Sequence, residues 1–312
     1  MRRREFIRDA GVLGVAWTLP FSAAAEAIKT QKMATRPIPG TDEQLPIVGF
    51  GNSSAFREGD YENSRKLLDV LVEYGGSFID SWSSSQEVLG RYMHEHDAKG
   101  KLFPGNNVGA KNKEDMDAAI RYAKEAQGKA VLDLLQLPNP GDFKRQWRLM
   151  RDAKEEGHAR YIGLATARSS HFETVEKLLQ SGTADFIQVN YSILETKTGE
   201  RLLPMARDNA VAVITNRPFL NGQFFPLVKD KELPAWAADF DCESWAQFSL
   251  KFILANPAVN CVITETSKPH HAMDNLTAGL GRLPDEETRK RMRALIQGFL
   301  ATSREPPELR TG

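Results

Sequence analysis

The feature of this chain that most limits its fold is a regular alternation of short apolar runs with longer segments of helical periodicity. Short apolar runs are typical of buried strands, and apolar residues spaced at i, i+3 and i+4 predict amphipathic helices. Successive runs begin 25 to 30 residues apart from the first to the seventh and 48 residues apart at the last, and about 30 residues accommodate a strand, a crossover helix and two loops. Eight units predict a single-domain α/β fold, a (β/α)8 TIM barrel, over residues 38–301. The expected strands begin at Ile47, Ser77, Asn107, Leu132, Arg160, Asp185, Val211 and Val259.

The composition excludes several other classes of protein. The 312 residues contain 41 Lys and Arg against 41 Asp and Glu, and 41% of positions are hydrophobic. These proportions are ordinary for a soluble globular protein and exclude a disordered or collagen-like chain. A net charge of zero without a basic stripe predicts no nucleic-acid partner. No Gly-rich dinucleotide fingerprint follows the early strands, which disfavours an open doubly wound sheet.

Residues 1–27 have the pattern of an export signal. Arg2, Arg3 and Arg4 precede a mostly apolar stretch that Pro20 interrupts, and small residues at 23–27 offer cleavage sites. The arginine pair resembles a twin-arginine signal, which predicts a periplasmic or exported protein handled by the twin-arginine machinery, with no membrane association after cleavage. The alternative is a basic, apolar N-terminus that arose by chance. At the other end, the tail at residues 302–312 is expected to be disordered.

Two groups of residues outside the barrel pattern invite other interpretations. Cys242 and Cys261 could form one disulfide, but their helical and strand-like surroundings favour two separate buried thiols. His94, His96 and Asp97 resemble a metal cluster, yet residues two apart on a helix point to different faces, so a solvated surface is expected and no metal site is predicted.

In a barrel of this kind the functional groups lie at the C-terminal ends of the strands. Asp80 ends the second expected strand and Lys111 the third. A carboxylate and an ammonium at adjacent strand ends can form a buried pair that tunes proton affinity for catalysis, or a structural ion pair that closes the barrel mouth. Spacing alone leaves both interpretations open.

Seven segments at these positions occur in the order found in a known family: residues 45–51 (LPIVGFG), 78–81 (FIDS), 110–111 (AK), 160–163 (RYIG), 188–192 (QVNYS), 216–219 (NRPF) and 266–275 (TSKPHHAMDN). Together they resemble the aldo-keto reductases, most of all a subgroup that carries twin-arginine signals. The resemblance covers nearly all of the chain after the signal and implies hydride transfer between NADP(H) and a carbonyl or sugar-like substrate.

By this resemblance Asp80 and Lys111 are catalytic, but the other two catalytic residues of the family have no counterpart. The tyrosine expected shortly after Asp80 is missing, with Ser83, Ser84 or Ser85 as conceivable substitutes. Pro138 stands where the family carries a histidine, and proline cannot donate a proton. The usual carbonyl-reducing mechanism is therefore in doubt.

The resemblance also implies the residues that hold NADP(H). A turn after the seventh strand would lie along the pyrophosphate, and a helix N-terminus after the eighth would meet the adenosine 2′-phosphate, unless that segment is only an ordinary capped helix. Glu265 would oppose the phosphate. The cofactor residues are expected to be Gln188, Asn216, Arg217, Pro218, Phe219, Gly222, Thr266, Lys268, His271 and Asn275.

Two functions remain open at this point. The first is an oxidoreductase of the aldo-keto reductase type with an altered catalytic site. The second is a non-catalytic barrel that binds a small ligand or a partner. The missing tyrosine and histidine favour the second, whereas Asp80, Lys111 and the phosphate-binding segment favour the first.

Overall fold

The computed structural model describes residues 32–51, 55–138 and 141–303. The expected export signal at residues 1–27 and nearly all of the expected tail lie outside these residues, and both remain predictions. Among the described residues, no helix combines the length and the apolar character needed to cross a bilayer.

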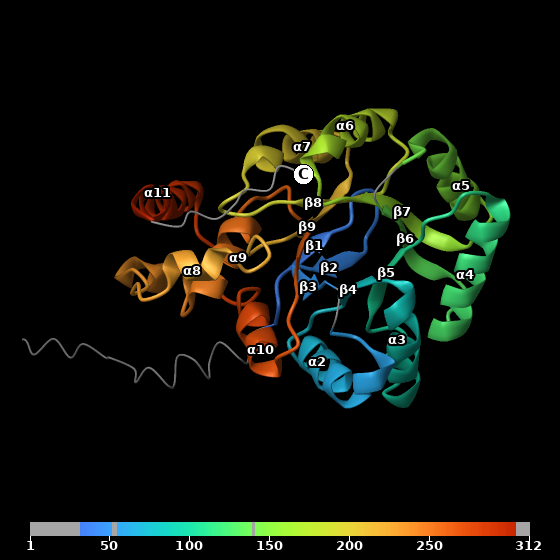
Figure 1. The fold of residues 1–312 in the computed structure, drawn as a ribbon, viewed down its shortest axis with the longest axis horizontal. Helices are drawn as coiled ribbons and strands as arrows, with labels where there is room; N and C mark the ends of the chain where they lie inside the picture. Colours follow the sequence, from blue (N-terminus) through green and yellow to red (C-terminus); the bar gives the residue numbers. More distant parts are fainter. Residues whose placement is uncertain (1–31, 52–54, 139–140, 304–312) are drawn as a thin grey trace, which may run out of the picture.

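Eight parallel strands form a closed barrel, with helices around the outside (Figure 1). The first strand, β3, pairs with the last, β10, which closes the sheet. The predicted fold class, a single (β/α)8 barrel, is therefore confirmed. In their order around the barrel the strands are β10 (Cys261–Thr264), β3 (Val48–Phe50), β4 (Phe78–Ser81), β5 (Phe103–Asn107), β6 (Leu132–Pro138), β7 (Ala159–Ala165), β8 (Phe186–Asn190) and β9 (Ala212–Asn216).

The helices bury one apolar face against this barrel, as their periodicity predicts. Several begin at polar N-cap residues: Asn112 Oδ1 accepts from the Asp115 N–H at 2.8 Å, and Asp285 Oδ1 accepts from the Thr288 N–H at 2.8 Å. The described helices are α2 (Tyr61–Glu73), α3 (Ser83–Glu95), α4 (Lys113–Gln127), α5 (Phe143–Glu155), α6 (Phe172–Ser181), α7 (Lys197–Asp208), α8 (Phe224–Val228), α9 (Trp245–Leu254), α10 (Pro269–Thr277) and α11 (Glu286–Thr302), with short 3-10 turns η1 (Glu58–Asp60), η2 (Ser169–His171) and η3 (Ala235–Phe240).

Seven of the expected strands overlap the observed ones, but the third was placed wrongly. The sequence analysis placed it at residues 107–111, whereas β5 is Phe103–Asn107, and all five of its residues are buried. Its sequence, FPGNN, contains residue types that are rare in strands, and the more strand-like VGA follows it. The strand therefore ends at Asn107 rather than at Lys111.

A hairpin not predicted from the sequence covers the N-terminal end of the barrel. Strands β1 (Thr35–Pro37) and β2 (Gln44–Pro46) are antiparallel, and Ile38 and Leu45 pack into the cluster that fills the barrel interior. This cluster contains the first residues of several strands, among them Phe78, Phe103 and Phe186.

Polar contacts fix this hairpin to the last part of the barrel and to β7. Arg36 NH1 donates to the carbonyl of Asn256 at 2.8 Å, and the same guanidinium also donates to the carbonyls of Leu254 and Val259. Glu43 accepts from Tyr161 Oη at 2.7 Å. Because the hairpin closes this end, the opposite end of the barrel is the one open to ligands.

Helices α3 and α4 approach each other closely at a glycine. A Cβ placed on Gly90 of α3 would lie 1.6 Å from the carbonyl oxygen of Ala126 in α4. No side chain fits at this distance, so the packing of the two helices requires glycine at position 90.

The prediction of two separate buried thiols agrees with the structure. Cys242 and Cys261 are free and buried. No group of His, Cys, Asp and Glu in residues 32–51, 55–138 and 141–303 could hold a metal ion. Helix α11 contacts α8 on the outside of the barrel.

Candidate functional site

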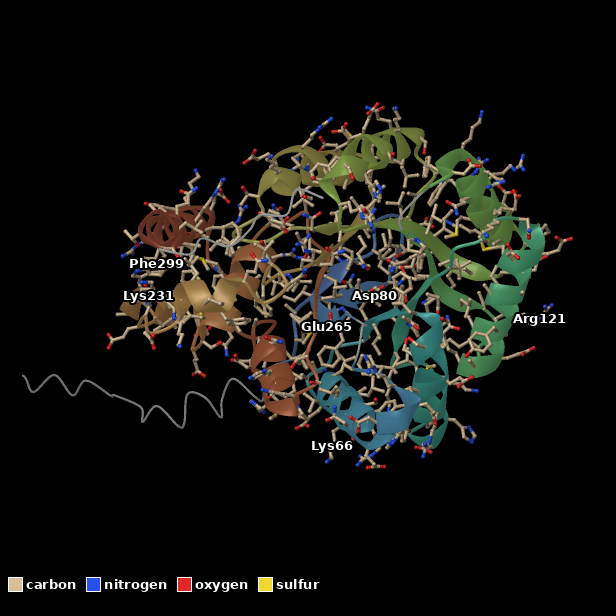
Figure 2. The ribbon with its side chains drawn as sticks, viewed as in Figure 1. Lys66, Asp80, Arg121, Lys231, Glu265 and Phe299 are labelled. Carbon is tan, nitrogen blue, oxygen red and sulfur yellow. The ribbon has the colours of Figure 1, made fainter. Side chains whose placement is uncertain are left out.

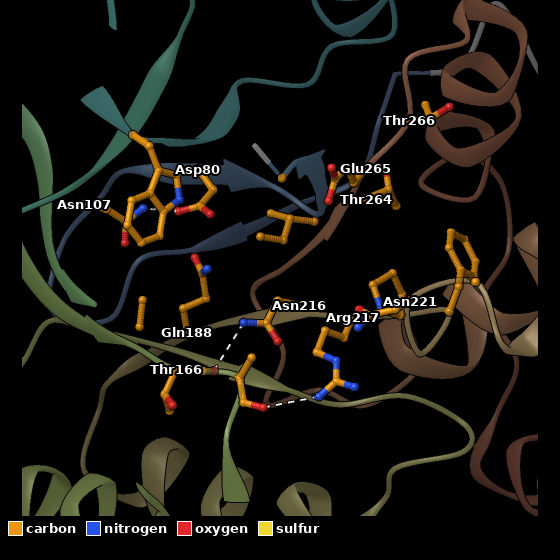
Figure 3. A pocket seen from close by; sticks show the side chains of 18 of the residues that line it. Asp80, Asn107, Thr166, Gln188, Asn216, Arg217, Asn221, Thr264, Glu265 and Thr266 are labelled. Atoms are coloured by element: carbon orange, nitrogen blue, oxygen red, sulfur yellow. Dashed lines mark hydrogen bonds between the residues drawn. The ribbon is translucent and has the colours of Figure 1, made fainter. Parts of the chain in front are cut away.

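A cavity of about 640 Å³ opens at the C-terminal end of the barrel. Figure 3 shows Asp80 and Asn107 at one end of it and Arg217, Asn221 and Thr266 at the other. Its described lining residues come mostly from strand ends and the loops after them: Gly51, Asp80, Trp82, Asn107, Pro138, Ala165, Thr166, Ala167, Gln188, Asn216, Arg217, Pro218, Phe219, Asn221, Gly222, Phe225, Ile263, Thr264, Glu265, Thr266 and Ser267.

Asp80 lies in β4 and is held by amide groups from neighbouring strands. Its Oδ1 accepts from Asn107 Nδ2 at 2.6 Å and from Gln136 Nε2 at 3.0 Å. Gln136 also donates to Gln188 Oε1 at 3.2 Å, so β4, β5, β6 and β8 are joined at the cavity floor. Asp80 is only 6% exposed.

The expected pair between Asp80 and Lys111 does not form. Lys111 is exposed, lies four residues beyond the end of β5, and does not line the cavity. Its backbone N–H donates to Asp115 Oδ2 at 3.2 Å. Because the third strand ends at Asn107, the side-chain amide of Asn107 lies beside Asp80, in the position expected for the Lys111 ammonium.

The substitutes considered for the missing tyrosine also lie outside the cavity. Ser83 and Ser84 are exposed, and the buried Ser85 donates its hydroxyl to the Trp82 carbonyl at 2.9 Å. Trp82, which is 38% exposed, lines the cavity. Pro138, which the resemblance aligns with a histidine, lines it as well. The described lining thus contains no Tyr, His or Lys side chain.

Burial raises the pKa of Asp80 to about 6, although hydrogen bonds from Asn107, Gln188, Trp82 and Gln136 act in the opposite direction. Burial disfavours the charged form of a carboxyl group, and here no nearby cation compensates for the lost hydration. At neutral pH the site therefore holds a carboxylate at a cost to stability.

This cost predicts how stability depends on pH. The pKa of the Asp80 carboxyl group is about 6 in the folded protein against the usual 3.8. The contribution of this group to folding stability is therefore greatest below pH 3.8 and is lost as the pH rises through 6. We expect the unfolding free energy of the natural protein, relative to Asp80→Asn, to be about 2 to 3 kcal/mol greater at pH 4 than at pH 8. Denaturant unfolding at both pH values measures this difference.

A control variant at Asp285 is expected to show the opposite dependence of stability on pH. The Thr288 backbone N–H lowers the pKa of Asp285, so this carboxylate stabilises the fold above its unfolded pKa and less so as the pH falls. Relative to Asp285→Asn, the natural protein is expected to lose stability on acidification. A difference between the natural protein and Asp80→Asn that does not change with pH would contradict the assigned environment of Asp80.

The turn after β9 supplies most of the predicted cofactor residues and has a strained backbone. Arg217, Leu220 and Asn221 have φ angles of 54°, 49° and 53°, and Gly222 has 87°. Non-glycine residues rarely adopt this left-handed conformation, and they concentrate at ligand sites. Asn216, Arg217, Pro218, Phe219 and Gly222 all line the cavity.

At the end of β9 and in this turn, two polar atoms of cavity-lining residues have no hydrogen-bond partner among the described residues. They are Asn216 Oδ1 and Arg217 Nε, both buried. Asn216 Nδ2 donates to the Thr166 carbonyl at 3.2 Å, and Arg217 NH1 lies 3.9 Å from Glu195 Oε1. Buried polar groups without partners are costly, so these atoms are available to a ligand.

A second cavity of about 320 Å³ adjoins the first and shares Phe219, Phe225, Glu265 and Thr266 with it. The predicted residues Thr266, His271 and Asn275 line this second cavity, whereas Lys268 lines neither. Two adjoining cavities provide an elongated site.

The N-terminus of α10 borders this second cavity. The helix has Pro269 in its first turn and no side chain that caps it. Lys268 is the N-cap residue, and its backbone N–H donates to Thr266 Oγ1 at 3.1 Å. Burial, then His270 and Lys268, lower the pKa of His271, so its imidazole is neutral at pH 7. An uncapped helix N-terminus suits a phosphate group.

Sequence reasoning missed Asn107 as a site residue and gave Trp82 no specific role. It also left out Phe225, which lines the cavity. Asn107 was missed because the third strand was placed four residues too late. A strand ending at Lys111 would run directly into the N-cap residue Asn112, leaving no loop before α4, and βα loops are usually two to six residues. This lack of a loop was the signal in the sequence that the strand had to end earlier.

Comparisons with known proteins agree with this geometry. The sequence profile of the aldo/keto reductase family matches residues 48–296. The chain therefore belongs to the aldo/keto reductase family. It is 21% identical over 304 residues to the uncharacterized oxidoreductase YqkF of Bacillus subtilis, covering 84% of this chain and 96% of that relative.

A shorter match and two solved structures complete the comparison. The chain is 36% identical over 74 residues to the NADH-specific methylglyoxal reductase of Escherichia coli, only 24% of this chain and 22% of the relative. An aldo-keto reductase from Klebsiella pneumoniae in complex with NADPH superposes with a TM-score of 0.69 at 17% identity, covering 90% of this chain and 98% of the other. The holo form of an aldo-keto reductase from Bacillus halodurans gives 0.68 at 18% identity, covering 90% and 100%. At these identities the likeness shows the shared fold.

Proposed function

We propose that this protein is an NADP(H)-dependent oxidoreductase of the aldo-keto reductase type with an altered catalytic site. It would transfer a hydride between the nucleotide and a small molecule held beside Asp80. The observation that carries the proposal is the elongated site formed by the two adjoining cavities, which contain Asp80 and nearly all of the predicted cofactor residues.

The residues present fit a dinucleotide. The unpartnered Asn216 Oδ1 and Arg217 Nε offer an acceptor and a donor, and the uncapped start of α10 offers backbone N–H groups. When bound, NADP(H) would supply the hydride. The chain's own contribution is to orient the nucleotide through these groups and to hold the substrate at the Asp80 end of the cavity.

A fluorescence titration tests the nucleotide site. NADPH is expected to quench the tryptophan emission and to bind more tightly than NADH. Asn275→Ala is expected to weaken NADPH binding about tenfold, because one hydrogen-bonding group at the second cavity is worth roughly 1 to 1.5 kcal/mol. Asn209→Ala, on the exposed end of α7, is the matched control and should bind as the natural protein does. Absence of NADPH binding would refute the proposal.

The non-catalytic barrel remains the second candidate, favoured by the lack of Tyr, His and Lys in the described lining. The two candidates differ in turnover. Nucleotide binding with no hydride transfer to any substrate would favour the non-catalytic barrel.

We also propose that residues 1–27 direct export through the twin-arginine machinery to the periplasm. The sequence pattern at Arg3 and Arg4 supports this proposal. Changing both residues to Lys is expected to leave the protein in the cytoplasm, as measured by cell fractionation. Normal arrival of the double variant in the periplasm would contradict the export proposal.

A further inference from the structure

The carboxylate at the floor of the cavity has only neutral partners. Asp80 accepts hydrogen bonds from Asn107 and Gln136, and every side chain that influences its ionisation is uncharged. It forms no ion pair with any described residue. Burying a carboxylate without a neighbouring cation costs desolvation free energy. A positively charged ligand would offset this cost, which no described side chain does.

The basic side chain elsewhere in the cavity does not neutralise the charge of Asp80. Among the described lining residues, Arg217 is the one basic side chain, and it lies at the opposite end of the cavity (Figure 3). It is opposed by Glu195 at 3.9 Å and donates to the Ala167 carbonyl. Figure 2 shows Asp80 near the barrel centre, with Lys66, Arg121 and Lys231 at the periphery. The Asp80 end is therefore negative.

An aromatic wall completes this end of the cavity. Trp82 follows β4 directly, lines the cavity with 38% of its surface exposed, and hydrogen-bonds to Asp80. The face of an indole ring attracts cations, and more strongly where the site excludes water. A carboxylate beside an indole is a suitable environment for a cationic nitrogen.

The same lining lacks what carbonyl reduction needs. When a hydride adds to a carbonyl carbon, the oxygen becomes an alkoxide that a donor has to protonate or stabilise. The described lining contains no Tyr, His or Lys side chain, and Asn107 Nδ2 already donates to Asp80 Oδ1 and to the Ser81 carbonyl. When a hydride adds to an iminium carbon, the nitrogen only loses its positive charge, and no proton donor is required.

We propose that the Asp80 end of the cavity binds a cationic nitrogen, and that the substrate is an iminium ion, the protonated C=N group of a Schiff base or cyclic imine. The inference rests on the proposed function for the hydride. The iminium carbon accepts the hydride from the reduced nicotinamide nucleotide and forms a C–H bond. The π electrons of the C=N bond become the nitrogen lone pair, and the nucleotide is oxidised. The neutral amine product takes a proton from water.

Two residues have defined roles in this proposal. Asp80 is the counter-ion of the substrate nitrogen. Asn107 is a positioning residue, because its amide holds Asp80 at 2.6 Å without adding a charge. A lysine at position 107 would neutralise Asp80 and exclude a second cation.

Binding to the natural protein, measured by calorimetry at pH 7.5, tests the proposal first. The probes are pyrrolidine, which is protonated at this pH, and tetrahydrofuran, its neutral analogue of similar shape. Pyrrolidine is expected to bind at least tenfold more tightly, because a partly buried ion pair is worth about 1.4 kcal/mol or more. Asp80→Asn and Asn107→Lys are each expected to abolish the preference, with circular dichroism to verify folding. Equal binding of the two probes by the natural protein overturns the proposal and requires no variant.

Turnover tests the second part of the proposal, that the substrate is an iminium ion. With NADPH present, 2-methyl-1-pyrroline is expected to be reduced to 2-methylpyrrolidine with one nucleotide oxidised per product, and cyclopentanone is expected to react at least 100-fold more slowly. Reduction of the ketone at the rate of the imine overturns the proposal. If NADPH does not bind but pyrrolidine is still preferred in an Asp80-dependent way, the nucleotide-dependent function is refuted while the cation site is supported.

Discussion

With NADPH and a simple aldehyde, the purified protein is expected to turn over about 10⁴- to 10⁶-fold more slowly than an aldo-keto reductase that has the usual proton donors. A positioned general acid contributes roughly 10²- to 10⁴-fold, and a second donor to the carbonyl oxygen about 10²-fold more. Pro138 and Asn107 line the cavity where such donors are expected, and neither can supply a proton in this way. Stopped-flow measurement of NADPH oxidation gives the rate.

Lys111→Met provides the control for this experiment. The resemblance implies that this lysine is catalytic, but the residue is exposed at the surface. The variant is therefore expected to match the natural protein within about twofold, as a surface substitution does. Aldehyde turnover within tenfold of an aldo-keto reductase that has the usual proton donors, or loss of turnover in Lys111→Met, would show that the catalytic groups have been misplaced.

Gly90→Ala is expected to lower the unfolding free energy by about 3 to 5 kcal/mol. Helix propensity alone favours alanine over glycine by about 1 kcal/mol. The added methyl group would, however, lie 1.6 Å from the Ala126 carbonyl, so α3 and α4 would have to separate along their contact. Urea denaturation of the natural protein and of Gly90→Ala measures the difference in unfolding free energy.

Gly298→Ala is the matched variant, because this glycine lies in the exposed part of α11 with nothing within 4 Å of a new Cβ. It is expected to stabilise the protein by up to about 1 kcal/mol. If both substitutions changed stability by the same amount, the close approach of α3 and α4 would not be present in solution.

The barrel could be predicted from the sequence because most of its strands are rich in β-branched and apolar residues. Strands such as AVITN and CVIT contrast with the amphipathic helices beside them, and their spacing determines the repeat. The hairpin at Thr35–Pro46 escaped prediction because each strand has only three residues, too few to show any period.

The candidate site was predictable at the end lined by Arg217 and Thr266 and less so at the end lined by Asp80. Asn216, Arg217 and Thr266 follow strands that were placed correctly, so their positions in the cavity followed from the barrel geometry. The partner of Asp80 depended on β5, whose FPGNN sequence has low intrinsic preference for a strand. Burial within the closed barrel, a tertiary effect, makes this segment a strand. An error of four residues then exchanged an amide for an ammonium at the site.

The contacts of Arg36 also determine when folding can be completed. Its carbonyl partners lie about 220 residues further along the chain, in and after α9. At a synthesis rate of 5 to 20 residues per second, roughly 10 to 45 seconds separate the emergence of the hairpin from that of its partners. Throughout this interval β3 also lacks its neighbour β10. The barrel therefore closes only after nearly the whole chain has been synthesised, and its first strands have to remain soluble without their final partners until then.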